Sequence, residues 1–134
     1  MLIIDGNEYK IEQEQVNVSL YTVQGIKGYA LFIKVSFTYN DKNGYFNLDA
    51  GYEKSDDIRY FLNREYKGIP FQNIDQVSFF EIFDTEKFLD TEIESDVILT
   101  LSDLKDNKVF AKIELNDELI KLNYEGYLEV EKWK

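Results

Sequence analysis

The chain has 134 residues and a formal net charge of −11, and it contains neither histidine nor cysteine. These absences exclude imidazole as a general base or metal ligand, and they exclude thiolate nucleophiles, soft metal sites and disulfides. Hydrophobic residues make up 44% of the chain and aromatic residues 16%, which excludes a disordered composition and predicts a single globular β-rich domain over residues 1–134.

The first well-defined element is a strand over residues 31–39. Its odd positions are apolar or aromatic, and positions 34, 36 and 38 are polar, which is typical of a half-buried strand. Turn-forming residues follow, and apolar alternation resumes over residues 46–50. Two connections fit this pattern, a two-residue turn at Asn43-Gly44 and a four-residue loop over residues 40–43. Both place the apolar residues of the two strands on one face.

One helix is predicted, at about residues 56–66. Ser55 is a favourable N-cap, and two acids follow it, which suits the positive end of a helix. Ile58, Phe61 and Leu62 form an apolar stripe at helical spacing. This helix is expected to pack against the sheet or across one of its open ends.

The C-terminal third predicts a three-stranded antiparallel meander. The apolar parities of its first two strands match only across an odd loop, and the three residues 105–107 fit this requirement. Leu99 then lies opposite Ile113, and Leu101 lies opposite Ala111. Asn107 would occupy the left-handed position of the loop, which asparagine tolerates.

The second connection of the meander requires an even loop near residues 117–118. Leu115 is then expected opposite Ile120, and Ile113 opposite Leu122. Gly126 is predicted to form a bulge in the last strand. The outer face of the meander carries mostly charged residues.

Together these elements predict a mainly β fold, an antiparallel β sandwich or rolled sheet with one short α-helix at about residues 56–66. The predicted core comprises Ile33, Val35, Phe37, Phe46, Leu48, Phe61, Val97, Leu99, Leu101, Ala111, Ile113, Ile120 and Leu122.

The negative charge is concentrated in the second half of the chain. Residues 1–67 carry 10 acids and 8 bases, whereas residues 68–134 carry 16 acids and 7 bases. Residues 75–96 contain eight acids and one base, interleaved with phenylalanines. Such a field attracts basic partners and repels nucleic acid and anionic membranes. The predicted partner-binding residues are Glu81, Phe83, Asp84, Glu86, Phe88, Asp90, Glu92, Glu94 and Asp96.

No motif of the chain predicts catalysis, a cofactor or a metal site. The residues around Asp41 and Gly44 fit a hairpin turn better than a calcium loop, because Ala50 occupies the position of the required glutamate. Asp103, Asp106 and Asp117 are better explained by turn propensity than by calcium binding. A carboxylate-based hydrolase is not excluded by composition, and Glu81, which lies among phenylalanines, is the nearest candidate acid.

A second binding hypothesis comes from the tyrosines, eight of which fall between residues 9 and 66. The alternation of apolar residues does not place all of these tyrosines on the core face. Several of the following five are expected to lie off it: Tyr21, Tyr29, Tyr45, Tyr52 and Tyr60. A row of such rings would suit sugar binding or a protein interface, although packing against the helix also explains it.

The leading interpretation is a non-catalytic acidic protein-binding domain of the immunity- or inhibitor-protein type, which neutralises a basic partner. Two alternatives stay open, a carbohydrate-binding β-sandwich module and an accessory or structural subunit of a larger assembly. No nucleic-acid or membrane partner is expected, and the sequence does not indicate an oligomeric state. A cytoplasmic location is expected, because the N-terminal residues lack the pattern of a signal peptide.

Overall fold

The computed structural model describes residues 1–39, 42–67, 77–84, 87–91, 96–116 and 120–131. Their regular elements are ten strands and one short 3₁₀ helix, η1, which confirms the predicted mainly β fold. In chain order they are β1 (Leu2–Ile4), β2 (Asn7–Val23), β3 (Ile26–Tyr39), β4 (Lys42–Glu53), η1 (Ile58–Phe61), β5 (Glu65–Lys67), β6 (Val77–Asp84), β7 (Lys87–Thr91), β8 (Asp96–Lys105), β9 (Lys108–Asn116) and β10 (Lys121–Glu131).

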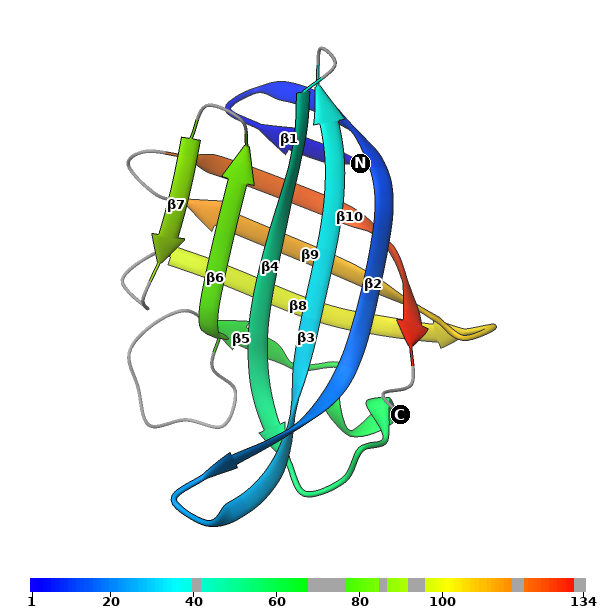
Figure 1. The fold of residues 1–134 in the computed structure, drawn as a ribbon. Helices are drawn as coiled ribbons and strands as arrows, with labels where there is room; N and C mark the ends of the chain where they lie inside the picture. The colour runs from blue at the N-terminus through cyan, green and yellow to red at the C-terminus, as the bar shows by residue number, and fades with distance from the viewer. Residues whose placement is uncertain (40–41, 68–76, 85–86, 92–95, 117–119, 132–134) are drawn as a thin grey trace.

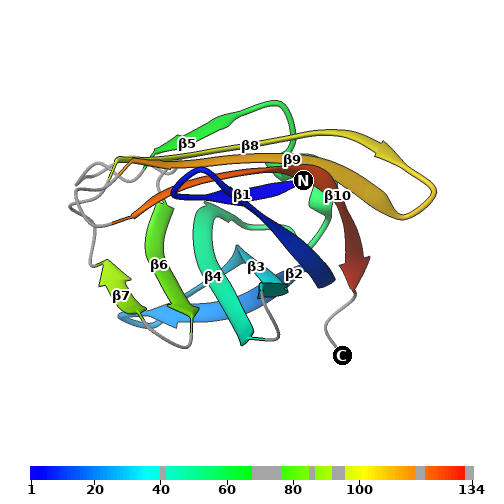
Figure 2. The same cartoon turned by 90° about the horizontal axis from the view of Figure 1, so that it is seen from above.

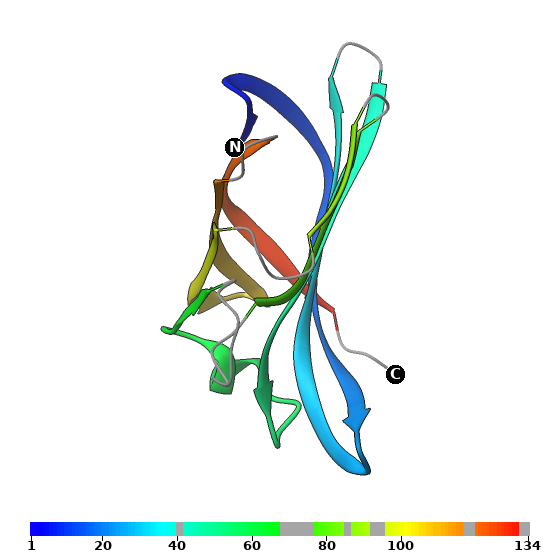
Figure 3. The same cartoon turned by 90° about the vertical axis from the view of Figure 1, so that its left-hand side faces the viewer.

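All ten strands belong to one sheet, in the order β5-β8-β9-β10-β1-β2-β3-β4-β6-β7 (Figure 1). The sheet is rolled, because β10 also pairs with β2, in parallel, where β1 has ended. Seen from above, β5, β8, β9 and β10 form one layer and β3, β4, β6 and β7 form the other (Figure 2). The strands of the two layers cross steeply, and the space between the layers is seen from the side in Figure 3.

The core lies between the two layers, where the inner faces meet. Every residue predicted for the core is buried. Strand β9 alternates between buried and outward residues along its whole length, as a strand with one covered face must. Two tyrosines that the prediction left out, Tyr66 and Tyr124, are also fully buried, at 0% exposure each.

The β3–β4 hairpin has the predicted faces but a different connection. Val35 pairs with Phe46 and Ile33 with Leu48, so the apolar residues of both strands share the inner face. The last pair is Tyr39 with Lys42, which leaves only residues 40–41 between the strands. Both predicted connections are therefore wrong, and residues 40–41 lie outside the described residues. A shift by two residues keeps every side chain on its face, so alternation alone does not discriminate between these registers.

The β8–β9 hairpin has the predicted register. Leu99 pairs with Ile113 and Leu101 pairs with Ala111. The predicted three-residue loop is wrong, because Lys105 pairs with Lys108 across a two-residue turn, and the register shifts between Ser102 and Lys105. The turn and this irregularity together supply the odd number of residues that the parities require.

The conformation of Asn107 is left-handed as predicted, with φ at 62°, and Asp103 and Asp106 also have positive φ, at 59° and 51°. Two successive left-handed residues, Asp106 and Asn107, are what a two-residue turn of the mirror-image type I′ class requires.

The β9–β10 pair differs from the prediction by two residues. Leu115 pairs with Leu122 rather than with Ile120, and Ile113 pairs with Tyr124 rather than with Leu122. The faces are again correct, and the true register places Tyr124 in the core. Gly126 does not form the predicted bulge, because it pairs regularly with Ala111.

The predicted α-helix is much shorter and of a different type. It is a 3₁₀ helix of four residues, Ile58–Phe61, and its N-cap is Asp57 rather than Ser55. Asn63 has a left-handed φ of 59°, which ends any helix, and Tyr66 belongs to β5, where it pairs with Leu99. The predicted apolar stripe does face the core through Ile58 and Phe61, because a spacing of three residues suits both types of helix.

Tyr66 fastens the chain after η1 to the sheet. Its buried hydroxyl donates a hydrogen bond to the carbonyl of Phe61 at 2.7 Å. Its ring passes close to Gly51, where a Cβ atom would lie 2.9 Å from Tyr66 Cε1. Gly51 also has a left-handed φ of 77°. Conformation and space therefore both require glycine at this position.

Candidate functional site

The acidic segment predicted as a partner site falls mainly on β6 and β7, at one end of the strand order. The register brings Glu81 opposite Asp90, Phe83 opposite Phe88, and Asp84 opposite Lys87. This hairpin thus unites Glu81, Phe83, Asp84, Phe88 and Asp90.

Of the other predicted site residues, Asp96 is the one that lies among the described residues. Asp96 begins β8, where it pairs with Asn116, so it belongs to a different part of the sheet. Glu86, Glu92 and Glu94 lie outside the described residues. The register also sets Glu81, the candidate catalytic acid, opposite Asn47 of β4. In β4, Asn47 is half-buried and alternates with the core residues Phe46 and Leu48.

A groove of about 460 Å³ lies between η1 and the turn that joins β8 to β9. Its apolar surface comes from Val18, Ile58, Leu104 and Val130, of which Leu104 is 37% exposed. Its charged residues are three acids, Asp56, Asp57 and Glu131, and one base, Arg59. The groove therefore combines apolar side chains with an acidic rim.

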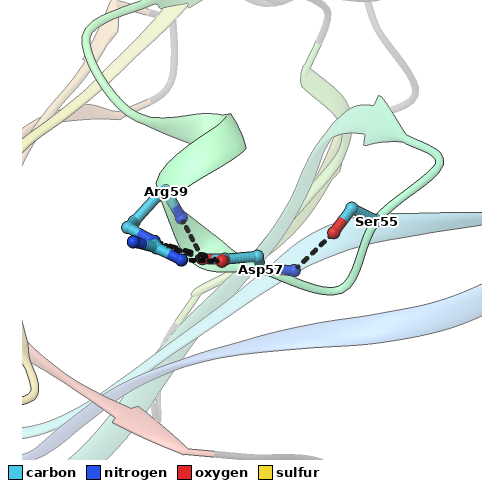
Figure 4. Close-up of polar contacts among 3 residues, drawn as sticks. All are labelled: Ser55, Asp57 and Arg59. Atoms are coloured by element: carbon cyan, nitrogen blue, oxygen red, sulfur yellow. Dashed lines mark hydrogen bonds and ion pairs between the residues drawn. The ribbon is translucent and has the colours of Figure 1, made fainter.

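Arg59, the one base among the residues that line this groove, is held by its neighbour Asp57 (Figure 4). Arg59 Nη2 lies 2.6 Å from Asp57 Oδ2, and the backbone nitrogen of Arg59 donates to Asp57 Oδ1 at 3.0 Å. The hydrogen bond and the negative charge of Asp57 raise the pKa of Arg59. Ser55 Oγ in turn accepts a hydrogen bond from the backbone nitrogen of Asp57 at 3.2 Å. Asp56 and Glu131 are the two acids of the lining that take no part in this pairing with Arg59.

A second pocket, of about 350 Å³, lies where β10 changes neighbours. The backbone nitrogen of Glu125 donates to the Met1 carbonyl at 2.9 Å, at the start of β1. Pairing of β10 with β2 begins only at Glu129, opposite Gln15. Residues 126–128 of β10 lie between these two ladders, and we call this interruption of the described pairing between β10 and β2 the seam. The lining of this pocket has three acids, Glu12, Glu14 and Glu129, and two cationic groups, Lys108 and the N-terminal ammonium of Met1, which donates a hydrogen bond to the Glu125 carbonyl.

A β-bulge in β2 directs Glu14 towards the inside of the rolled sheet. The register against β3 shifts by one residue between Ile11 and Gln13, so that Glu12 is the extra residue. Glu14 then lies opposite Val35, which is a core residue. Residues that pair in an antiparallel ladder share a face, so the bulge brings Glu14 inwards, in the way that bulges re-aim side chains near functional sites.

Glu14 meets a buried tyrosine inside the sheet. The Tyr124 hydroxyl donates a hydrogen bond to Glu14 Oε2 at 3.0 Å. Burial, the negative charge of Glu14 and this hydrogen bond raise the pKa of Tyr124, so the hydroxyl stays a donor. Glu14 is half-buried, and no cationic group of the described residues forms an ion pair with it. One carboxylate oxygen is thus fixed from within, next to the seam.

The sequence analysis missed Glu14, although the sequence contains a signal for it. Tyr9 and Ile11 are apolar at odd positions, whereas Val16 and Val18 are apolar at even positions. Such a change of parity within one strand indicates a bulge, and Glu14 is the polar residue of the new parity that comes directly before Val16. Tyr124 carries no signal of its own, because it reads as one more apolar position.

The tyrosines that suggested a binding row lie in different surroundings, as far as the structure describes them. Tyr29 packs against the core, and Tyr60, on η1, is 55% exposed. Tyr52 lies over Gly28, and its hydroxyl donates to the Lys27 carbonyl at 3.3 Å. Tyr45 is a half-buried residue of β4. These four residues do not form one row. The side chain of Tyr21 does not belong to the part of the chain that the structure describes.

Among the described residues, no group of three or more acidic side chains could hold a metal ion. Asp103 and Asp106 are accounted for by their left-handed backbone in and beside the turn, and Asp117 lies outside the described residues. None of the helices in the described ranges is long and apolar enough to cross a membrane. No protein-family model, no curated protein and no solved structure matches this chain.

Proposed function

We propose that this chain is a non-catalytic binding domain for a basic protein, of the kind that inhibits or neutralises its partner. The observation that carries the proposal is the excess of acids over bases at both pockets. The groove beside η1 is lined by three acids and one base, which is paired with one of these acids. The second pocket is lined by three acids, by Lys108 and by Met1 with its N-terminal ammonium. A surface of one sign accelerates encounter with a partner of the opposite sign.

The acid-rich β6–β7 hairpin supports the same proposal. It carries Glu81, Asp84 and Asp90, and it belongs to the most acidic stretch of the sequence. Aromatic residues among the acids, Phe83 and Phe88, would supply lasting contact area once the partner has docked. The lack of histidine and cysteine favours a binding role over an enzymatic one.

The proposal is tested by capture of partners from the cells of origin at low and high salt. The bait is compared with a variant in which Glu86, Asp90 and Glu92 are replaced by lysine. The control bait changes three exposed acids on other strands, Glu8, Glu65 and Glu114, to lysine, so both variants have the same net charge.

The expected result is a basic protein that the unmodified chain and the control retain at low salt, and that the hairpin variant loses. Retention by all three baits at both salts would contradict the proposal. Binding of the chain to a glycan array, with no protein partner, would favour the carbohydrate-binding alternative instead.

A further inference from the structure

We propose that the groove beside η1 is the docking site of the chain's own segment Lys132-Trp133-Lys134, with the Trp133 ring against its apolar residues. This segment follows β10 directly and lies outside the described residues. The inference goes beyond the proposed function, because it concerns a contact within the chain and needs no partner protein.

The end of β10 brings the segment to the groove. Glu131 is the last residue of β10 and also belongs to the groove lining. Val130, another residue of the lining, is fixed to the β8–β9 turn: its backbone nitrogen donates to the Asn107 carbonyl at 3.0 Å, and its carbonyl accepts from Asn107 Nδ2 at 2.8 Å. Two extended residues span at most about 7 Å, so the backbone of Trp133 is within this distance of Glu131.

The groove suits an indole ring in size and in lining. Its volume of about 460 Å³ lies within the range of roughly 300–1,000 Å³ that is usual for ligand pockets. Leu104, one of its four apolar residues, is 37% exposed and would be covered by the ring. Trp133 is the single tryptophan of the chain. A tryptophan gains from burial of its large ring when polar groups lie near its N–H, and the lining offers both kinds of surface.

The charges of the segment complement those of the groove. The lining has three acids and one base, a formal charge of −2, and the two lysines of the segment carry +2. Asp56 and Glu131, which take no part in the pairing of Arg59 with Asp57, match the two lysines in number. Docking of the segment would therefore neutralise the groove.

The covalent connection strengthens this contact. A short tether gives a segment an effective concentration in the millimolar range at its site, so even a weak interaction is populated. A basic partner that used this groove would first have to displace the segment. The chain's own tail thus acts as an internal competitor for the groove.

The fluorescence of the single tryptophan tests the docking directly. The reference is the acetylated, amidated peptide Glu-Lys-Trp-Lys, in which the indole is fully in water. We expect the full chain to emit at shorter wavelength than the peptide and to have a lower acrylamide quenching constant, because the docked ring is shielded from water.

Variants of the groove identify the site. Leu104→Ser removes an apolar contact and should move both readouts towards those of the peptide. Leu20→Ser changes a leucine that is 51% exposed and does not line the groove, so it should leave both readouts unchanged. Asp56→Lys should act like Leu104→Ser through charge repulsion, whereas Glu114→Lys makes the same charge change at an exposed position on β9 and should have no effect.

A second measurement keeps the test valid if Leu104→Ser does not fold. Amide spectra of the ¹⁵N-labelled chain and of Trp133→Ala are compared, and we expect shift differences at Arg59 and Leu104, on both sides of the groove.

Several results would overturn the inference. One is an emission and a quenching constant of the full chain equal to those of the peptide. Others are unchanged fluorescence in Leu104→Ser, an equal response to Leu20→Ser, or amide shift differences confined to the sequence neighbours of Trp133. The proposed function would survive any of these outcomes, because its test depends on the hairpin and on the capture of a protein.

Discussion

Gly126 leaves open the space that the Tyr124 hydroxyl occupies: a Cβ atom on Gly126 would lie 2.8 Å from Tyr124 Oη and 3.2 Å from its Cζ. The two residues lie on the same face of β10, two positions apart. The Tyr124 hydroxyl donates its hydrogen bond to Glu14. The glycine that the sequence suggested as a bulge is therefore explained by a close approach of a side chain.

Gly126→Ala should destabilise the fold by about 1–3 kcal/mol, because the methyl group forces Tyr124 out of place. In a Tyr124→Phe background the cost of the same change should be smaller, since the closest atom is gone. Urea unfolding of the two single variants and the double variant measures this coupling. Strictly additive costs would show that the two side chains do not compete for space.

Replacing Leu99 or Ile113 by alanine should cost about 2–5 kcal/mol, because each is fully buried and the two pair across β8 and β9. Glu114, next to Ile113, is exposed and serves as the control, with an expected change within about 0.5 kcal/mol on substitution by alanine. The measurement is chemical denaturation. A cost for Leu99→Ala as small as that of the control would contradict the assigned core.

Asn107 has two roles in its turn. Its φ is 62°, and its side-chain nitrogen donates to the Val130 carbonyl at 2.8 Å. Asn107→Ala loses the hydrogen bond and strains the left-handed backbone, for a cost of about 2 kcal/mol. Asn107→Gly loses the hydrogen bond alone and should cost less. Equal destabilisation by both, in thermal or urea unfolding, would mean that the backbone conformation contributes nothing.

Asp49 predicts a pH dependence. Burial raises its pKa above the ordinary value of 3.8. The folded state therefore binds the proton more tightly than the unfolded state, so the contribution of Asp49 to stability is present at low pH and is lost as the pH rises through the folded pKa. Asp49→Asn should stabilise the fold at pH 7, and this gain should vanish below pH 3.8.

Thermal unfolding across this pH range measures the effect, with Asp56→Asn as a matched change at an exposed carboxylate. A gain from Asp49→Asn that persists unchanged at the acid end would contradict the burial of this carboxylate.

The faces of the strands could be predicted from the sequence, and their registers only in part. Period-2 alternation assigned Phe46 and Leu48 to the core, but it cannot distinguish registers that differ by two residues, as in the pairing of Leu115 with Leu122. The β8–β9 register agrees with the prediction although the predicted loop is wrong, because the register shift between Ser102 and Lys105 supplies the extra residue that the two-residue turn lacks. The prediction of an α-helix was wrong because it relied on local helical preference, which is weak. Burial of Tyr66 in β5 stabilises the chain more than that local preference does.

Of the candidate sites, only the acidic composition of the hairpin could be predicted from the sequence. The acidic hairpin is visible in the sequence because its residues are neighbours along the chain. The seam pocket is not, because Glu14 and Tyr124 are separated by 110 positions and meet only when β10 returns to β2. A change of parity in β2 is the one local trace of that meeting.

The central claim, recognition of a basic partner through the acidic surface, is tested most directly by the association rate with the captured partner over a range of salt concentrations. Stopped-flow measurements compare the unmodified chain, the Glu86, Asp90 and Glu92 lysine variant, and the Glu8, Glu65 and Glu114 control. We expect the hairpin variant to associate about tenfold more slowly at low salt and with a flatter salt dependence, and the control to slow much less. Equal rates for all three proteins at low salt would contradict the claim.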